Sequence, residues 1–96
     1  KDYKVIILMV LADWCGACKQ FKSTGAIEEL KGIIGEDNIL IANDKDQDVM
    51  KDLNIRAFPT LCAARIDPTG KLTKLEDAQS RKAVDLAALF KKHDGK

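Results

Sequence analysis

Two cysteines spaced three residues apart, Cys15 and Cys18, are the residues of this sequence best suited to chemistry. They follow the apolar run 5–11, so a buried strand should give way to a helix at this point. The N-terminus of a helix carries unpaired N–H groups and partial positive charge, which favour a thiolate over a thiol. We therefore expect Cys15 to be the reactive thiol and Cys18 to close a disulfide with it, as disulfide exchange requires.

The composition is that of one globular domain over residues 1–96, with 46% hydrophobic and 32% charged residues. Sixteen basic and fifteen acidic residues nearly cancel, so nothing indicates a nucleic acid, a membrane surface or a strongly charged substrate as partner. The longest apolar run, 5–12, is too short to span a bilayer, and no signal-peptide pattern follows it.

The three cysteines are an odd number, which fits chemistry better than a set of structural disulfides. This usage favours a reducing compartment such as the cytoplasm, although a domain cut from a periplasmic, secreted or membrane-anchored protein would show the same pattern. Cys62 lies in an apolar segment, where we expect a buried and inert thiol. We expect His93, the single histidine, to be a solvated residue of the C-terminal tail.

The elements that position the two cysteines begin with residues 5–11, which predict a central strand covered on both faces. Helical spacing then continues from Cys15 to Ile34, with a kink or short break expected at residues 23–25 and a stop at Gly35. Residues 38–42 predict a second strand, parallel to the first through a right-handed crossover.

The acidic segment 43–48 connects this second strand to a short helix that should bury Val49, Met50 and Leu53. Either Asp46 or Asp48 is suited to cap that helix. The alternation of Asp44, Asp46 and Asp48 is also typical of a calcium loop, but the glycine and the later glutamate of such a loop are missing. A solvated turn is the better interpretation.

The C-terminal part predicts a hairpin and a final helix. Pro59 suits the first position of a strand over residues 60–66, and the turn residues 67–70 lead into a returning strand over 71–76. Ser80 should cap a helix that buries Ala83, Leu86, Ala87 and Phe90. The chain therefore predicts an α/β domain with a four-stranded mixed sheet, formed by a parallel pair and an antiparallel hairpin and flanked by helices.

The segment Trp-Cys-Gly-Ala-Cys-Lys at residues 14–19, with Phe58-Pro59-Thr60 before a later strand, resembles the thioredoxin family. The similarity covers residues 5–90 in element order as well as in motif. It implies a thioredoxin-like fold in a minimal version that lacks the family's extra N-terminal strand and helix. It also implies that the Phe58–Pro59 bond is cis and lies beside Cys15.

The resemblance implies a thiol-disulfide oxidoreductase, most simply a reductase that takes part in electron transport. Cys15 would attack a protein disulfide and Cys18 would resolve the mixed disulfide. An upstream dithiol or flavoprotein would then reduce the Cys15–Cys18 pair. The expected protein is a monomer that needs no cofactor and no metal. The residues expected to contact the substrate are Trp14, Gly16, Ala17, Phe58 and Pro59.

Four positions depart from the family pattern. Met9 stands where thioredoxins proper carry a buried Asp that helps move the proton of the second cysteine, so water would have to serve Cys18. Ala17 replaces the usual proline, Leu11 replaces an aromatic residue, and Asp77 falls about where the family has a glycine near the substrate groove. These changes leave the fold intact and bear on the redox role.

Other readings of the same residues stay open. A thioredoxin-fold adaptor would bind partners with little turnover, and a domain of a larger secreted protein would act as an oxidase or isomerase. A glutaredoxin-like cluster or glutathione site is a further option. Zinc is another alternative, because four residues would complete a ligand set: Cys15, Cys18, Cys62 and His93.

Overall fold

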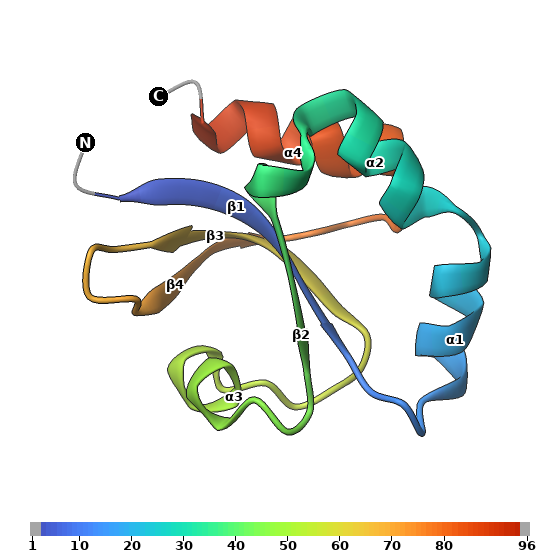
Figure 1. Cartoon of the computed structure of the whole chain (residues 1–96), viewed down its shortest axis with the longest axis horizontal. Coiled ribbons are helices and arrows are strands. Elements are labelled where there is room, and N and C mark those ends of the chain that lie inside the picture. The colour runs from blue at the N-terminus through green and yellow to red at the C-terminus, as the bar shows by residue number, and fades with distance from the viewer. Residues whose placement is uncertain (1–2, 95–96) are drawn as a thin grey trace.

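The computed structural model describes residues 3–94. The elements follow one another along the chain, with a short 3-10 turn between the second helix and the second strand (Figure 1). They are β1 (Lys4–Leu11), α1 (Gly16–Ser23), α2 (Ala26–Ile34), η1 (Glu36–Asn38), β2 (Ile39–Asn43), α3 (Gln47–Leu53), β3 (Thr60–Ile66), β4 (Leu72–Asp77) and α4 (Ala83–Asp94).

The four strands form one sheet in the order β2-β1-β3-β4. β1 and β2 are parallel, with Ile7 opposite Ile39, and the other two pairs are antiparallel. A bulge between Ala63 and Ala64 shifts the register of β3 against β4. The predicted α/β fold class and the mixed sheet are therefore confirmed.

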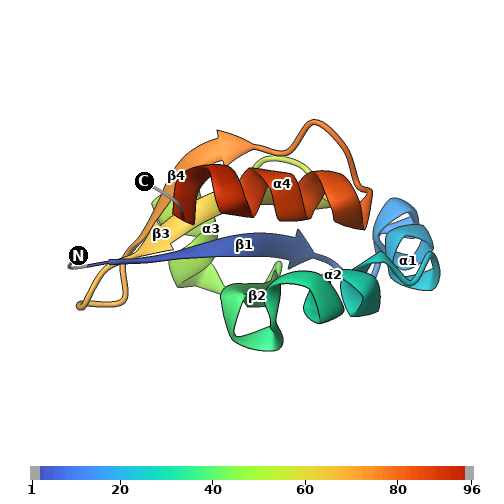
Figure 2. The ribbon, with the colours of Figure 1, turned by 90° about the horizontal axis from the view of Figure 1, so that it is seen from above.

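The central strand β1 is buried on both faces because helices cover the sheet from two sides. Every second residue, such as Ile7 and Met9, packs toward α2 and α4, whereas Leu8 and Val10 pack toward α3. Figure 1 shows α2 and α4 above the sheet and α3 below it, and Figure 2 shows α4 lying along β1. The unbroken apolar run of β1 is the sequence signature of this two-sided burial.

The predicted break in the first helical segment separates α1 from α2. The Thr24 hydroxyl donates to the Phe21 carbonyl and accepts from the Ala26 N–H, so it serves the end of one helix and the start of the next. Gly25 adopts a left-handed φ of 79°, and Gly35 ends α2 as expected with a φ of 92°. Asp46 caps α3 through its carboxylate and the Val49 N–H.

Two expectations for the C-terminal part were wrong. The Ser80 hydroxyl accepts from the Lys82 N–H and so closes a local turn, while α4 itself begins only at Ala83. His93 is not a solvated tail residue, because it belongs to α4 and its Nε2 lies 2.9 Å from the Glu76 carboxylate. The returning strand β4 spans Leu72–Asp77, one residue later than predicted.

None of the helices within residues 3–94 has the length and hydropathy needed to cross a bilayer.

Candidate active site

Cys15 is the N-cap residue of α1, and it follows the end of β1 at Leu11 after a short turn. Its backbone is extended, with φ −87° and ψ 113°, and its Sγ accepts a hydrogen bond from the Cys18 N–H at 3.1 Å. The sulfur therefore occupies the place that a serine or aspartate oxygen takes in an ordinary N-cap. Both cysteines are free thiols in this structure.

The surroundings of the two thiols move their pKa values in opposite directions. The pKa of Cys15 is lowered, chiefly by a hydrogen bond from the Cys18 thiol. Burial acts in the opposite direction, but the backbone N–H groups of Cys18 and Ala17 and the charge of Arg81 lower this pKa further. The pKa of Cys18 is raised, chiefly because burial disfavours its charged form. The pair thus combines one thiol that ionises readily with one that holds its proton.

The indole of Trp14 forms the exposed edge of the site, with 68% of its surface accessible. Its Nε1–H donates to the Asp44 carboxylate at 2.7 Å. Its ring also meets Phe58 edge to face, with 5.3 Å between the ring centroids. Trp14 is therefore held in place from two sides although its outer face is open to solvent.

A groove of about 370 Å³ runs past Pro59 and the chain segment that joins β4 to α4. The Phe58–Pro59 peptide bond is cis. Phe58, next to Pro59, packs against the apolar cluster that contains Cys15. Arg81 lines the same groove, and its charge helps to lower the pKa of Cys15. The groove residues are Pro59, Thr60, Leu61, Asp77, Ala78, Gln79, Ser80 and Arg81.

The other predicted contact residues lie in the first turn of α1. Gly16 is exposed, and a Cβ added there would meet no heavy atom within 4 Å. Ala17 is half-buried and packs against the apolar cluster that contains both cysteines. Asp77 lines the groove and pairs with Lys74 at 3.1 Å.

Beneath Cys18 the interior is entirely apolar. Met9 is fully buried in the same cluster as Cys18, and no polar or charged side chain is buried anywhere in residues 3–94. A proton leaving Cys18 therefore has no buried side chain to receive it.

The zinc alternative was wrong because the sheet separates its ligands. Cys62 packs in the cluster on the α3 side, whereas Cys15 and Cys18 pack on the side of α2 and α4. No group of three metal-ligating side chains occurs in the described part of the chain. Cys62 is buried as expected, and burial raises its pKa to about 11.

Asp44 and Arg81 belong to the site but were not identified from the sequence. The signal for Asp44 was present, since it follows β2, and the carboxyl ends of parallel neighbours meet at one edge of the sheet. Arg81 had no local signal, because only the packing of the β4–α4 connection brings its charge near Cys15.

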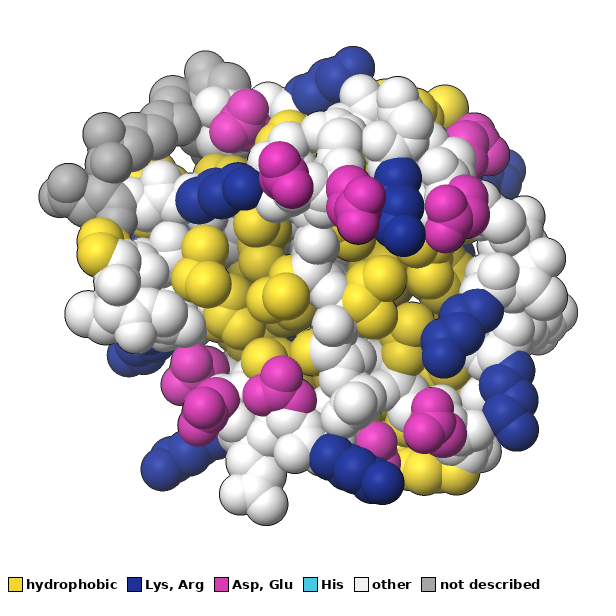
Figure 3. All heavy atoms as spheres, viewed as in Figure 1, with side chains coloured by type: hydrophobic (Ala, Val, Ile, Leu, Met, Phe, Trp, Pro, Cys, Tyr) yellow, Lys and Arg dark blue, Asp and Glu magenta, His cyan; other side chains and the backbone are white. Residues whose placement is uncertain are grey.

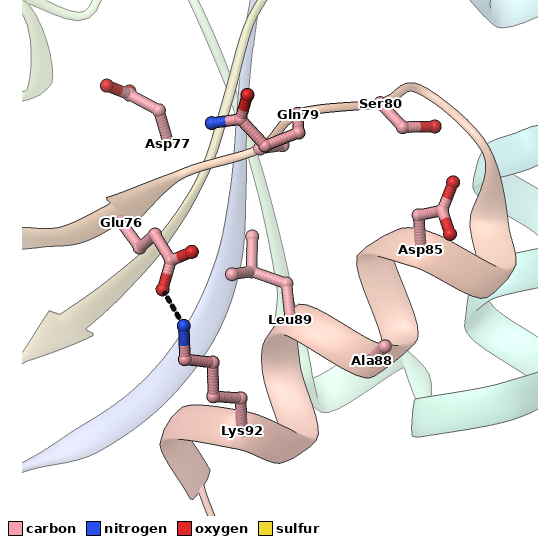
Figure 4. A pocket seen from close by; sticks show the side chains of 9 residues that line it. Glu76, Asp77, Gln79, Ser80, Asp85, Ala88, Leu89 and Lys92 are labelled. Carbon is pink, nitrogen blue, oxygen red and sulfur yellow. Dashed lines mark hydrogen bonds and ion pairs between the residues drawn. The ribbon is translucent and has the colours of Figure 1, made fainter.

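A larger hollow of about 410 Å³ lies on the other side of that connection, between β4 and α4. In Figure 4 Leu89 extends from α4 toward β4, and Lys92 reaches across to Glu76. Glu76 is held at 2.8 Å by Lys92 and at 2.9 Å by His93. No cysteine lines this hollow.

Comparisons with known proteins agree with this geometry. A family model described as Thioredoxin matches residues 1–92. The malaria parasite's thioredoxin-2, described as a component of its protein secretion machinery, is similar at TM-score 0.65 and 26% identity, over 95% of this chain and 84% of that one. A search of curated protein sequences found no match.

Two further solved structures share the fold at lower identity. A thioredoxin of Malassezia sympodialis has a TM-score of 0.63 at 23% identity, over 95% of this chain and 76% of its own. The Trx4 domain of ERdj5 has a TM-score of 0.67 at 20% identity, over 94% and 79%. At these identities the similarity shows the fold alone.

Proposed function

The chain belongs to the thioredoxin family, and we propose that it reduces disulfides in proteins. A domain of this family implies chemistry of the thiol-disulfide oxidoreductase type. The single observation that carries the proposal is the placement of the Cys15 sulfur at the N-cap of α1, where the Cys18 N–H donates to it. The reducing direction presupposes a compartment with a supply of dithiol or flavoprotein reductant, such as the cytoplasm.

The reaction transfers two electrons from the cysteine pair to the substrate. The Cys15 thiolate attacks one sulfur of the substrate disulfide, the substrate S–S bond breaks, and the departing thiolate takes a proton from water. Cys18 then loses its proton and attacks the Cys15 Sγ, which releases the second substrate thiol. The products are a substrate dithiol and the Cys15–Cys18 disulfide, which the upstream reductant restores.

We expect the substrate to bind in the groove beside Pro59. An extended segment around the substrate disulfide would pair with the backbone next to Pro59 and lie against Trp14 and Phe58. Gly16 would leave room for its close approach, and Ala17 would offer a small apolar contact. Because the fully buried Met9 supplies no carboxylate, the proton of Cys18 would have to pass to water.

The test is an insulin-reduction assay driven by dithiothreitol. We expect turnover that falls to the rate of dithiothreitol alone in Cys15→Ser, because the attacking thiolate is gone. Cys62→Ser is the matched control and should keep the activity, since Cys62 lies on the other side of the sheet. Cys18→Ser should accumulate mixed disulfides with proteins of a lysate. Equal turnover in the wild type and Cys15→Ser would contradict the proposal.

The exposed Trp14 favours one further candidate, an adaptor that binds a partner with little turnover. For an adaptor, Cys15→Ser would leave partner binding unchanged and Cys18→Ser would trap nothing. The reduction potential of the cysteine pair decides the direction of a true exchanger. A value near roughly −270 mV fits a reductase, and one above about −180 mV fits an oxidase or isomerase.

A further inference from the structure

The groove beside Pro59 has two charged residues on its walls, Asp77 and Arg81, and only one of them has an ionic partner. The carboxylate of Asp77 lies 3.1 Å from the ammonium group of Lys74. The guanidinium of Arg81 is exposed and has no ion pair within residues 3–94. The unpaired charge of this groove is therefore positive.

This positive charge belongs to the same region as the reactive thiol. Trp14, which precedes Cys15, contacts Phe58 edge to face, with 5.3 Å between the ring centroids. Phe58 packs against the apolar cluster that contains Cys15. Its neighbour Pro59 lines the groove together with Arg81. The residues that flank a substrate disulfide at Cys15 therefore come to lie along the wall that carries Arg81.

The acidic residue of the groove lies at its far end. In the ladder between β3 and β4, Asp77 stands opposite Cys62. A strand rises about 3.3 Å per residue, so this position is about 10 Å along β3 from Pro59. Arg81 follows after the chain has left β4. A substrate residue next to the attacked cysteine therefore meets Arg81 rather than Asp77.

The helix that Cys15 caps adds positive charge to this end of the molecule. α1 carries Lys19 and Lys22 and no acidic residue. Figure 3 shows basic side chains over α1 at the right of the view, whereas acidic and basic side chains stand side by side over α2. Two carboxylates, Asp13 and Asp44, belong to the Trp14 side of the site, where Asp44 accepts from the indole. The net charge of +1 conceals this uneven distribution.

We propose that Arg81 directs the protein toward disulfides that have an acidic residue next to the attacked cysteine. The preference rests on the proposed disulfide reduction and names the class of its substrates. A carboxylate at that place meets the guanidinium in the groove, which speeds the encounter and adds specificity. A lysine or arginine at the same place meets a like charge. Because exposed charge pairs contribute modestly, the preference is a matter of several-fold differences in rate.

The test measures a single attack by Cys15 on a peptide disulfide. The full chain with Cys18→Ser is mixed with a peptide whose single cysteine carries a 2-pyridyl sulfide. The Cys15 thiolate attacks the peptide sulfur and forms a new S–S bond, while the bond to the pyridyl sulfur breaks and pyridine-2-thione leaves with its electrons. The reaction stops at the mixed disulfide, and the absorbance of the released thione gives the rate.

Three peptides differ only in the residue on both sides of the cysteine, which is glutamate, glutamine or lysine. Each rate is divided by that of mercaptoethanol, an uncharged thiol, with the same peptide. The glutamate peptide should then react about five- to tenfold faster than the lysine peptide at low salt. Because salt screens exposed charges, this ratio should approach one at about 0.5 M salt.

Substitutions at Arg81 make the test specific. Arg81→Glu should reverse the order of the peptides, and Arg81→Lys should retain the preference, since the positive charge is kept. Lys71→Glu is the matched control, because it makes the same change of charge in the turn between β3 and β4, at the other end of these strands. It should leave the ratio as it is. The ratio is independent of the Cys15 pKa, because both peptides meet the same thiolate in any one variant.

A ratio that Arg81→Glu leaves unchanged overturns the proposal. So does a preference of the parent protein for the lysine peptide, which would assign recognition to Asp13 or Asp44. A wild type that prefers the glutamate peptide but turns over no insulin contradicts the reductase function and leaves the role of Arg81 standing. A Cys15 that reacts with none of the peptides overturns both.

Discussion

At the scale of single residues, position alone makes two identical side chains differ. Cys15 caps α1 and receives a backbone N–H, whereas Cys18 is enclosed in the apolar interior with no accessible surface. The first setting stabilises a thiolate and the second a thiol. This asymmetry is what an exchange reaction requires, because one sulfur must attack and the other must wait.

The pH dependence of alkylation tests this asymmetry. A thiolate forms above its pKa, and because the pKa of Cys15 is lowered, its reaction with iodoacetamide should reach half its maximal rate at a lower pH than for free cysteine. Cys62, whose pKa is raised to about 11, is the internal control and should react last. Mass spectrometry of modified peptides gives both rates.

Arg81→Ala should move the Cys15 midpoint to higher pH, because the charge of Arg81 helps to lower the pKa of this thiol. Lys71→Ala removes an equal charge from the turn before β4 and should leave the midpoint in place. Identical midpoints in Arg81→Ala and the wild type would exclude Arg81 from the site.

At the scale of elements, the break between α1 and α2 lets two short helices follow different directions. α1 presents Cys15 at the end of the sheet, and α2 packs Leu30 into the core beside α4. The break depends on a left-handed residue, Gly25, and on the double use of the Thr24 hydroxyl. A single straight helix would not serve both tasks.

Two glycine substitutions separate this backbone effect from packing. Gly25→Ala should destabilise the fold by about 1–2 kcal/mol, because an L-residue resists the left-handed conformation. Gly32→Ala lies inside α2 and should stabilise by about 0.5–1 kcal/mol. Neither new Cβ meets a heavy atom within 4 Å, so packing contributes to neither result. Urea unfolding measures both, and equal signs would contradict the explanation.

At the scale of the whole molecule, the two faces of the sheet are covered unequally. α2 and α4 cover one face, and α4 alone buries Ala83, Leu86, Ala87 and Phe90. The other face relies on α3, a helix of seven residues in which only Val49 is buried. The helices on the α2 and α4 side therefore bury more side chains than α3 buries on the other side.

Native-state hydrogen exchange should reveal this difference. The amides of β1 and β3 should exchange only through global unfolding, whereas those of α3 should open locally at a free energy lower by about 2 kcal/mol or more. α4 serves as the comparison among helices and should be protected more strongly than α3. Protection of α3 as strong as that of β1 would show that both faces unfold as one unit.

Much of this molecule could be predicted because its signals are local. The apolar run of β1, the interruption at residues 23–25 and the turn residues 67–70 each act on neighbours in the chain, and each element formed where expected. The Cys15–Cys18 relationship is local too, since a helix start fixes which thiol receives the N–H. For Ser80 the local signal misled, because its hydroxyl closed a turn before the helix.

Contacts between residues far apart in the sequence could not be predicted from local sequence patterns. Trp14 is held by Asp44 and Phe58, Arg81 acts on Cys15, and His93 meets Glu76. The sheet also decides which side of the core each cysteine occupies, and so separates Cys62 from the reactive pair. Hydrogen bonds within a turn and side-chain periodicity depend on a few adjacent residues, whereas these contacts exist only once strands and helices have packed.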